Sequence, residues 1–323
     1  MPSWHASTNP KDGMTMIDDH QFSRLDRFNG LLVRYPRMNE VFKRFDFLRM
    51  KARSVRDLTA SDKLNVTSLF ALPLIAPSGS GKSRIINAYM QKVMNEQHPA
   101  GVTPVLVVEL SAKLSVKNFY SDVLKAFGDP NFERGTQQHL QARTQSFIRK
   151  CGVELLIIDE VHHLISSETN KVSWDVAELF KGILNNKDCC LVLSGIGKAS
   201  VLFSNNDQLA RRCISPAPLD PLDIQNAAEW EMFMGFIGRL DQMMAKQKVT
   251  DGPNGLLEGD VPACLYEISG GIIGHVHQLL YHALLCCFVR GGSILDRQDL
   301  AKATDTWALP NNISKTNPFK KNK

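Results

Sequence analysis

Four short apolar runs recur along the first two thirds of the chain, each bounded by polar or glycine- and proline-containing segments. They occupy residues 69–75, 104–110, 153–158 and 190–193. Between them, apolar residues recur at intervals of three and four, the spacing of amphipathic helices. Buried strands that alternate with helices are typical of a parallel sheet covered on both faces. The pattern therefore predicts an α/β domain.

The hydrophobic pattern changes after residue 215. Pro216, Pro218 and Pro221 indicate a linker, and beyond it only helical periodicity remains. Helices are predicted at about 224–247, 261–268, 273–289 and 296–307. The predicted organisation is a flexible N-terminal tail at 1–20, a basic helical region at 21–60, the α/β core at 61–221, a small all-helical lid domain at 222–309 and a basic disordered tail at 310–323.

The composition is that of a globular protein. The chain has 323 residues, of which 43% are hydrophobic and 22% charged. No apolar run approaches the roughly 20 residues that cross a bilayer, and the N-terminus lacks a secretory pattern, so we expect a cytoplasmic protein without a membrane partner. The seven cysteines include no C-x-x-C pair, which favours reduced, buried thiols. A net charge of +5 permits nucleic-acid binding without requiring it.

The first apolar run leads into the segment APSGSGKS and then into helical periodicity. A strand, a glycine-rich turn with Gly-Lys-Ser and a helix make up a P-loop, whose backbone N–H groups surround phosphate oxygens. Lys82 would reach the β- and γ-phosphates of ATP, and the Ser83 hydroxyl would bind Mg²⁺. Ala76 stands where a first glycine is expected, which a negative φ would allow. The predicted nucleotide contacts are Pro77, Ser78, Gly79, Ser80, Gly81, Lys82, Ser83, Arg84 and Asp159.

The ends of the third and fourth runs supply the remaining candidates for nucleotide hydrolysis. Asp159 directly follows the third run and is the second predicted Mg²⁺ ligand, with Ser83. Glu160 is placed to polarise the attacking water as a general base. Ser194 ends the fourth run, where its hydroxyl could contact the γ-phosphate or the water. Arg211 or Arg212 could reach the γ-phosphate of a neighbouring subunit, and an arginine in that role contributes about 10³–10⁵ in rate.

Two histidines, His162 and His163, closely follow the acidic pair. Adjacent histidines point in different directions and lack the i, i+4 spacing of a helical zinc pair, so we expect no metal there. The sequence Asp-Glu-Val-His also looks like the DExH box of helicases. Those enzymes need a second RecA-like domain, for which residues 216–323 offer no strands.

Together these motifs resemble the AAA+ ATPases, an α/β domain followed by a helical lid. Within them the chain resembles the TniB/TnsC family of transposition ATPases over residues about 30–310. The segments that carry the resemblance are Tyr35-Pro36-Arg37, APSGSGKS, VKNFYSDVLKAFGDP with the following Gly135-Thr136, GVELLIIDEVHHL, LSGIG, NDQLARR and SGGIIGHVHQLL.

The resemblance implies a protein that binds ATP with Mg²⁺ and assembles with itself as a ring or helical filament on duplex DNA. Such proteins recruit a DDE-type transposase, often through a TniQ-type adaptor, and ATP hydrolysis disassembles the filament and helps to select the target site. DNA contacts in the family come from pore loops, and here the loop after the second strand carries Lys113 and Lys117. The lid lacks the Gly-x-x-Arg arginine of many relatives, so turnover is expected to be slow; His275 is the candidate replacement.

Three other interpretations remain open from the sequence. The first is another AAA+ protein associated with DNA, such as a clamp or helicase loader, which differs in partner rather than chemistry. The second is a P-loop kinase for a small molecule, against which stand the Asp-Glu pair, the paired arginines and the long helical C-terminal region. The third is a scaffold that binds ATP but barely hydrolyses it. Glu160 argues against a scaffold, and the missing lid arginine argues for it.

Overall fold

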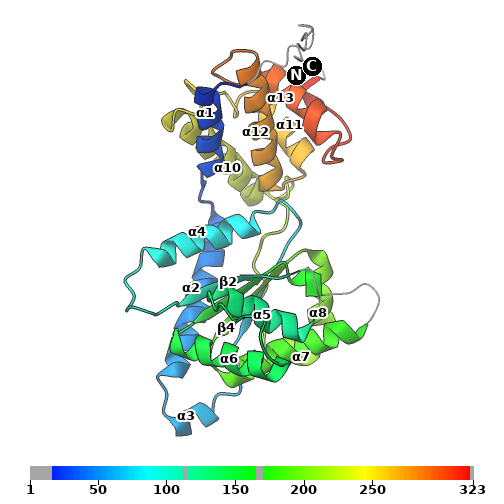
Figure 1. Cartoon of the computed structure of the whole chain (residues 1–323). Helices are drawn as coiled ribbons and strands as arrows, with labels where there is room; N and C mark the ends of the chain where they lie inside the picture. Colours follow the sequence, from blue (N-terminus) through cyan, green and yellow to red (C-terminus); the bar gives the residue numbers. More distant parts are fainter. Residues whose placement is uncertain (1–16, 112–114, 165–169, 321–323) are drawn as a thin grey trace, which may run out of the picture. The chain divides into compact units, whose positions relative to one another are not determined.

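The computed structural model describes residues 17–111, 115–164 and 170–320, and these fall into two compact units (Figure 1). Arg34–Pro221 form an α/β unit, and the residues up to Val33 join those from Leu222 onward in a helical unit. The α/β unit contains α2 (Pro36–Arg56), α3 (Ala60–Leu64), β1 (Ala71–Ile75), α4 (Lys82–Met94), β2 (Val105–Glu109), α5 (Val116–Ala126), α6 (Gln137–Lys150), β3 (Leu155–Asp159), α7 (Asn170–Asn186), β4 (Cys190–Gly195), α8 (Val201–Ser204) and α9 (Asp207–Ala210).

The four predicted apolar runs are the four strands of one sheet, in the order β1-β4-β3-β2 with every neighbouring pair parallel. The register pairs Glu109 with Asp159 and Ser194 with Leu74, so the carboxyl ends of all four strands lie at the same edge. Helix α2 packs on β3 and β4 and against α4, while α5 packs with α6 and α7 (Figure 1). The predicted α/β fold with a parallel sheet flanked by helices is confirmed, and the strand ends gather the candidate residues.

Capping residues explain where several helices begin. Ser115 accepts a hydrogen bond from the backbone N–H of Asn118 at the start of α5, and Thr136 accepts one from His139 at the start of α6. Helix α4 begins differently, because its first flanking residue is Gly81 in the left-handed conformation and no side chain caps it. The free N–H groups of α4 therefore face the loop that precedes it.

The helical unit contains α1 (Asp19–Gly30), α10 (Ala227–Lys246), α11 (Val261–Ser269), α12 (Ile273–Val289) and α13 (Arg297–Ala303). Its core is one cluster of buried apolar side chains that includes Phe28 and Phe233. Among the described helices, none alone is long and apolar enough to cross a membrane; by length and composition only the pair α11 and α12, bent by 114°, passes that test. All seven cysteines of the chain are free thiols, as predicted, and four of them are buried.

The predicted basic region 21–60 is divided between the two units. In the helical unit, the Phe28 ring of α1 stacks on the His277 ring with the centroids 4.4 Å apart, and Arg24 donates to the carbonyl of Val249. In the α/β unit, Arg49 of α2 is buried and pairs with the carboxylates of Glu96 and Glu154. The interleaved apolar residues of 21–60 thus serve two separate cores, which the continuous helical pattern did not reveal.

The predicted disordered tail at 310–323 is wrong for the part of it that the structure describes, residues 310–320. Phe319 is only 4% exposed and joins the core of the helical unit, and its carbonyl accepts a hydrogen bond from Arg297. Lys320 pairs with the carboxylate of Asp305. Burial of the aromatic ring, together with hydrogen bonds from Thr316 and Asn317, holds this basic segment on the helices. Residues 1–16 of the predicted N-terminal tail lie outside the described residues, and Asp18 caps α1.

Candidate nucleotide site

The loop between β1 and α4 has the backbone geometry that phosphate binding requires. Gly79 and Gly81 adopt φ angles of 78° and 87°, in the left-handed region that favours glycine. A Cβ on Gly81 would meet no atom within 4 Å, so the backbone conformation rather than a lack of space calls for glycine. Ala76 does not adopt a positive φ, and alanine therefore replaces the expected first glycine without strain. The loop and the N-terminus of α4 can surround an anion with N–H groups.

Lys82 is the first residue of α4 and lies folded back on this loop. Its Nζ donates to the carbonyl oxygens of Ala76 at 2.9 Å and Pro77 at 3.0 Å, and the residue is only 6% exposed. A P-loop lysine without bound phosphate is expected to face solvent, and Lys82 does not, because its ammonium group is bonded within its own loop. Burial lowers the pKa of Lys82, while the charges of Glu160 and Asp159 oppose this shift. A phosphate oxygen would give this ammonium a charged acceptor in place of neutral carbonyls.

Asp159 joins three elements at the carboxyl edge of the sheet. Its Oδ2 accepts a hydrogen bond from Ser83 Oγ of α4 at 3.1 Å, and its Oδ1 accepts one from Ser194 Oγ of β4 at 2.6 Å. The backbone N–H of Glu160 donates to the same Oδ1. Ser83, Asp159 and Ser194, all predicted from the sequence, are therefore brought together. A hydroxyl and a carboxylate are the hard oxygen ligands that Mg²⁺ prefers, so the donor set fits this ion.

Glu160 adopts a left-handed backbone conformation, with φ at 58°, which is uncommon for a residue other than glycine. Its Oε2 lies 3.1 Å from Nε2 of His162 and 3.7 Å from Nε2 of His163. The two imidazole rings lie 4.5 Å apart at an angle of 31°. The prediction that adjacent histidines point in different directions is wrong here, because residues 161–164 form a 3₁₀ turn. In the sequence, this cluster was visible as one glutamate and two histidines within four residues.

The paired arginines, which directly follow α9, have different environments. Arg212 donates from Nε to Asn185 Oδ1 at 3.2 Å and from Nη1 to the carbonyl of Gln208 at 2.6 Å. Arg211 is exposed, and none of the residues that the structure describes pairs with its guanidinium group. The backbone beside them is fixed, since the N–H of Ala71 in β1 donates to the carbonyl of Arg212. The geometry therefore separates two residues that the sequence left equivalent.

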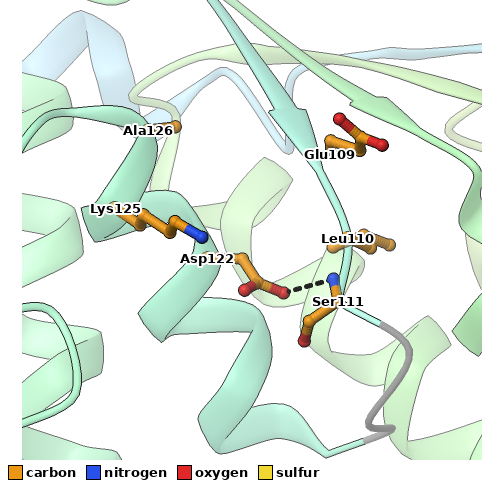
Figure 2. Close-up of a pocket in the computed structure, with 6 residues that line it drawn as sticks. All are labelled: Glu109, Leu110, Ser111, Asp122, Lys125 and Ala126. Atoms are coloured by element: carbon orange, nitrogen blue, oxygen red, sulfur yellow. Dashed lines mark hydrogen bonds between the residues drawn. The ribbon is translucent and has the colours of Figure 1, made fainter. Parts of the chain in front are cut away.

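The predicted DNA-contacting lysines flank the start of α5. Lys113 lies outside the described residues, and Lys117 is exposed on the first turn of the helix. A neighbouring pocket of about 440 Å³ is lined by residues from the end of β2 and from α5, as Figure 2 shows. Asp122 accepts a hydrogen bond from the Ser111 N–H in that pocket, and Glu109 and Lys125 contribute opposite charges. The carboxylates of Glu109 and Asp122 outnumber the single ammonium group of Lys125, so the pocket carries net negative charge and would bind phosphate poorly.

His275 belongs to the helical unit, where its Nδ1 lies 3.3 Å from the carbonyl oxygen of Ser269. Burial lowers the pKa of His275 below its usual value near 6.5. The imidazole is therefore mostly neutral at pH 7 and does not supply the fixed positive charge of the lid arginine that the sequence lacks.

The chain is similar to known proteins in sequence family and in fold. A family model described as "Bacterial TniB protein" matches residues 29–221. The chain is similar in structure to Cdc6p from Pyrobaculum aerophilum, with a TM-score of 0.54, 14% identity and coverage of 85% of this chain and 68% of that one. It is also similar to Drosophila ORC bound to DNA, with a TM-score of 0.54, 10% identity and coverage of 94% and 70%.

A third similar structure is the Aeropyrum pernix ORC2 protein in ADPNP and ADP complexes, with a TM-score of 0.50, 14% identity and coverage of 79% and 66%. No curated protein sequence matches significantly. At these identities, the structural likenesses show the fold alone.

Proposed function

The chain belongs to the bacterial TniB family, and from this premise we propose that it is an ATP-dependent regulator of DNA transposition. In this proposal it binds ATP with Mg²⁺, assembles with itself on duplex target DNA and recruits a DDE-type transposase, with a TniQ-type adaptor as a further partner. Hydrolysis of ATP then controls disassembly and the choice of target site. The ATPase part of this proposal is supported by the two hydrogen bonds that bring Ser83, Asp159 and Ser194 together beside the P-loop.

Each side chain at the site has a specific task in this proposal. The N–H groups of residues 78–81 and the start of α4 surround the phosphates, and Lys82 exchanges its two carbonyl partners for phosphate oxygens. Ser83 and Asp159 would hold Mg²⁺, which when bound neutralises charge on the β- and γ-phosphates. Ser194 is fully buried, and its hydrogen bond fixes the orientation of the Asp159 carboxylate.

Glu160 is the proposed general base, and Arg211 is the proposed arginine that a neighbouring subunit contributes. The Glu160 carboxylate comes directly after Asp159 and can take a proton from water. Arg211 is the better of the two arginines for this role, because Arg212 is already bonded to Asn185 and Gln208 of its own chain. Because Arg211 has no partner among the residues that the structure describes, its guanidinium group is available to a neighbouring subunit.

Replacing Glu160 by glutamine should slow ATP hydrolysis by about 10²–10⁴-fold while leaving ATP binding intact. The amide has nearly the same shape but cannot accept the proton, so the protein should accumulate in its ATP-bound, DNA-assembled form. Phosphate release and sedimentation with duplex DNA measure the two effects. A matched change of an exposed acid, Glu133→Gln, should affect neither. Unchanged hydrolysis in the Glu160 variant would show that Glu160 is not the base.

DNA binding should tolerate any sequence and weaken with salt. The proposed contacts, Lys113 and Lys117, reach phosphates, and each phosphate contact contributes about −0.9 to the slope of log affinity against log salt. We therefore expect a slope near −1.8 for each subunit, and Lys117→Ala should reduce it by about 0.9. Lys125→Ala is the control, because Lys125 lies on the same helix above the Phe132 ring. A salt-independent affinity, or strong preference for one short sequence, would contradict this proposal.

A second candidate function is that of another AAA+ protein associated with DNA, such as a helicase or clamp loader. The similar folds of Cdc6p and ORC favour it, and the family match favours transposition. The two candidates differ in partner. If an integrase-type transposase is encoded beside this gene, the immobilised protein should retain it only when ATP and duplex DNA are both present. A loader would not retain it under any of these conditions.

A further inference from the structure

We propose that His162 is a positioning residue that holds the Glu160 carboxylate by donating a hydrogen bond from Nε2 as a neutral imidazole. The inference rests on the proposed role of Glu160 as the base and assigns a function to a side chain outside the nucleotide motifs. Its first observation is geometric: Nε2 of His162 lies 3.1 Å from Oε2 of Glu160, which is hydrogen-bonding distance.

The turn that carries His162 is packed closely against β4. A Cβ on Gly195, at the end of that strand, would lie 3.1 Å from Val161 Cγ2 and 3.5 Å from the backbone nitrogen of His162. Val161 itself is fully buried. Glycine at position 195 thus lets the 3₁₀ turn lie directly on the strand end. The backbone of His162 is therefore held in place beside Glu160 by packing on β4.

The surroundings of Nδ1, the second ring nitrogen of His162, determine which of the two nitrogens carries the proton. Nδ1 of His162 is buried and has no hydrogen-bond partner among the residues that the structure describes. An N–H at that position would be buried without an acceptor, which is costly, whereas a bare lone pair costs less. The proton therefore belongs on Nε2, which lies 3.1 Å from the Glu160 carboxylate oxygen. The same reason opposes a second proton on the ring, and burial lowers the pKa of His162 accordingly.

The same observation argues against a metal ion at these residues. Glu160, His162 and His163 place three ligand atoms within 4.8 Å of one another, and such a set could hold a divalent transition metal. Binding through Nε2 of His162 would force its proton onto Nδ1, where a ligating histidine normally has an acceptor. None is present among the described residues. A neutral donor to Glu160 satisfies the ring better than a metal does.

The consequence for catalysis is a Glu160 carboxylate with a fixed orientation. A hydrogen bond donated to Oε2 orients the carboxylate and leaves Oε1 to accept a proton from water. The contact involves neither the P-loop nor Lys82. Loss of His162 should therefore lower kcat for hydrolysis and leave KM for ATP unchanged.

The kinetic test compares three variants in the presence of duplex DNA. His162→Ala should lower kcat by about 10–100-fold with KM for ATP within about twofold of the wild type. His162→Gln should restore most of kcat, because the glutamine amide places an N–H donor near the position of Nε2. His163→Ala is the control and should retain kcat, since its imidazole is half exposed and lies farther from Glu160. A raised KM with unchanged kcat in His162→Ala, or no rescue by glutamine, would overturn the proposal.

A second measurement does not depend on hydrolysis. Nitrogen-15 spectra of the histidine rings in the full-length protein should show His162 neutral with its proton on Nε2, and Glu160→Gln should shift that signal. A proton on Nδ1, or joint binding of added Zn²⁺ by His162 and His163 at micromolar concentration, would overturn the proposal. Failure of the ATPase assignment is detected separately, because it would leave ATP binding unaffected by a change at Lys82.

Discussion

Lys82→Ala is expected to abolish measurable ATP binding. The lysine would be the buried cation that contacts the phosphates, and removing one partner of a buried charge pair costs about 2–5 kcal/mol. That is roughly a 30-fold to several-thousand-fold increase in the dissociation constant. The measurement is a titration with a fluorescent ATP analogue in the presence of Mg²⁺.

The structure also defines the controls for this variant. Alanine removes the hydrogen bonds from Nζ to Ala76 and Pro77, so a small loss of stability of about 1 kcal/mol is expected alongside the loss of binding. Lys82→Met keeps most of the apolar stem but removes the ammonium group, with its charge and its hydrogen bonds, and it should also fail to bind. Lys92→Ala, at the far end of the same helix, removes a part-buried pair with Asp46 and a contact with the Tyr89 ring, and it should bind ATP normally. Normal binding by a folded Lys82→Ala protein would contradict the P-loop assignment.

Arg211→Ala should reduce hydrolysis in the presence of DNA by about 10³-fold or more, with ATP binding by the monomer nearly intact. The reason is that Arg211 would stabilise charge on the γ-phosphate of an adjacent subunit, while the P-loop of its own subunit is untouched. Arg212→Ala is the matched control. Its guanidinium bonds Asn185 and Gln208, so the change should cost some stability but far less hydrolysis.

Complementation between variants tests whether the site is shared. Mixing the double variant Arg211→Ala/Arg212→Ala with Lys82→Ala should restore part of the hydrolysis, because one type of interface then combines an intact P-loop with an intact arginine. Neither protein alone should hydrolyse ATP at more than a trace rate. If the double variant hydrolyses ATP at the wild-type rate in the presence of DNA, or if Arg212→Ala is the more damaging single change, the assignment to Arg211 fails.

The sequence determined the features that depend on neighbours close in the chain. The four apolar runs form four parallel strands, as predicted. Strands that are separated by helices are connected by crossovers, and a crossover connection allows neighbouring strands to run parallel. The P-loop could be recognised from the sequence because the glycines that adopt positive φ angles, Gly79 and Gly81, lie within one turn of six residues. Asp159 was placed correctly as well, since a polar residue directly after a buried parallel strand lies at the carboxyl edge of the sheet. The family followed from the same local motifs.

The tertiary structure alone decided features that depend on distant partners. Helix α1 packs with the C-terminal helices, where Phe28 stacks on His277. Phe319 is buried in the same core, so the basic C-terminal segment packs on the helical unit. The difference between Arg211 and Arg212 arises from Asn185, on another helix. The contact of His162 with Glu160 depends on a 3₁₀ turn packed on Gly195. Local periodicity specifies helices and strands, but the partner that buries or bonds a given side chain is fixed only when segments far apart in the chain pack together.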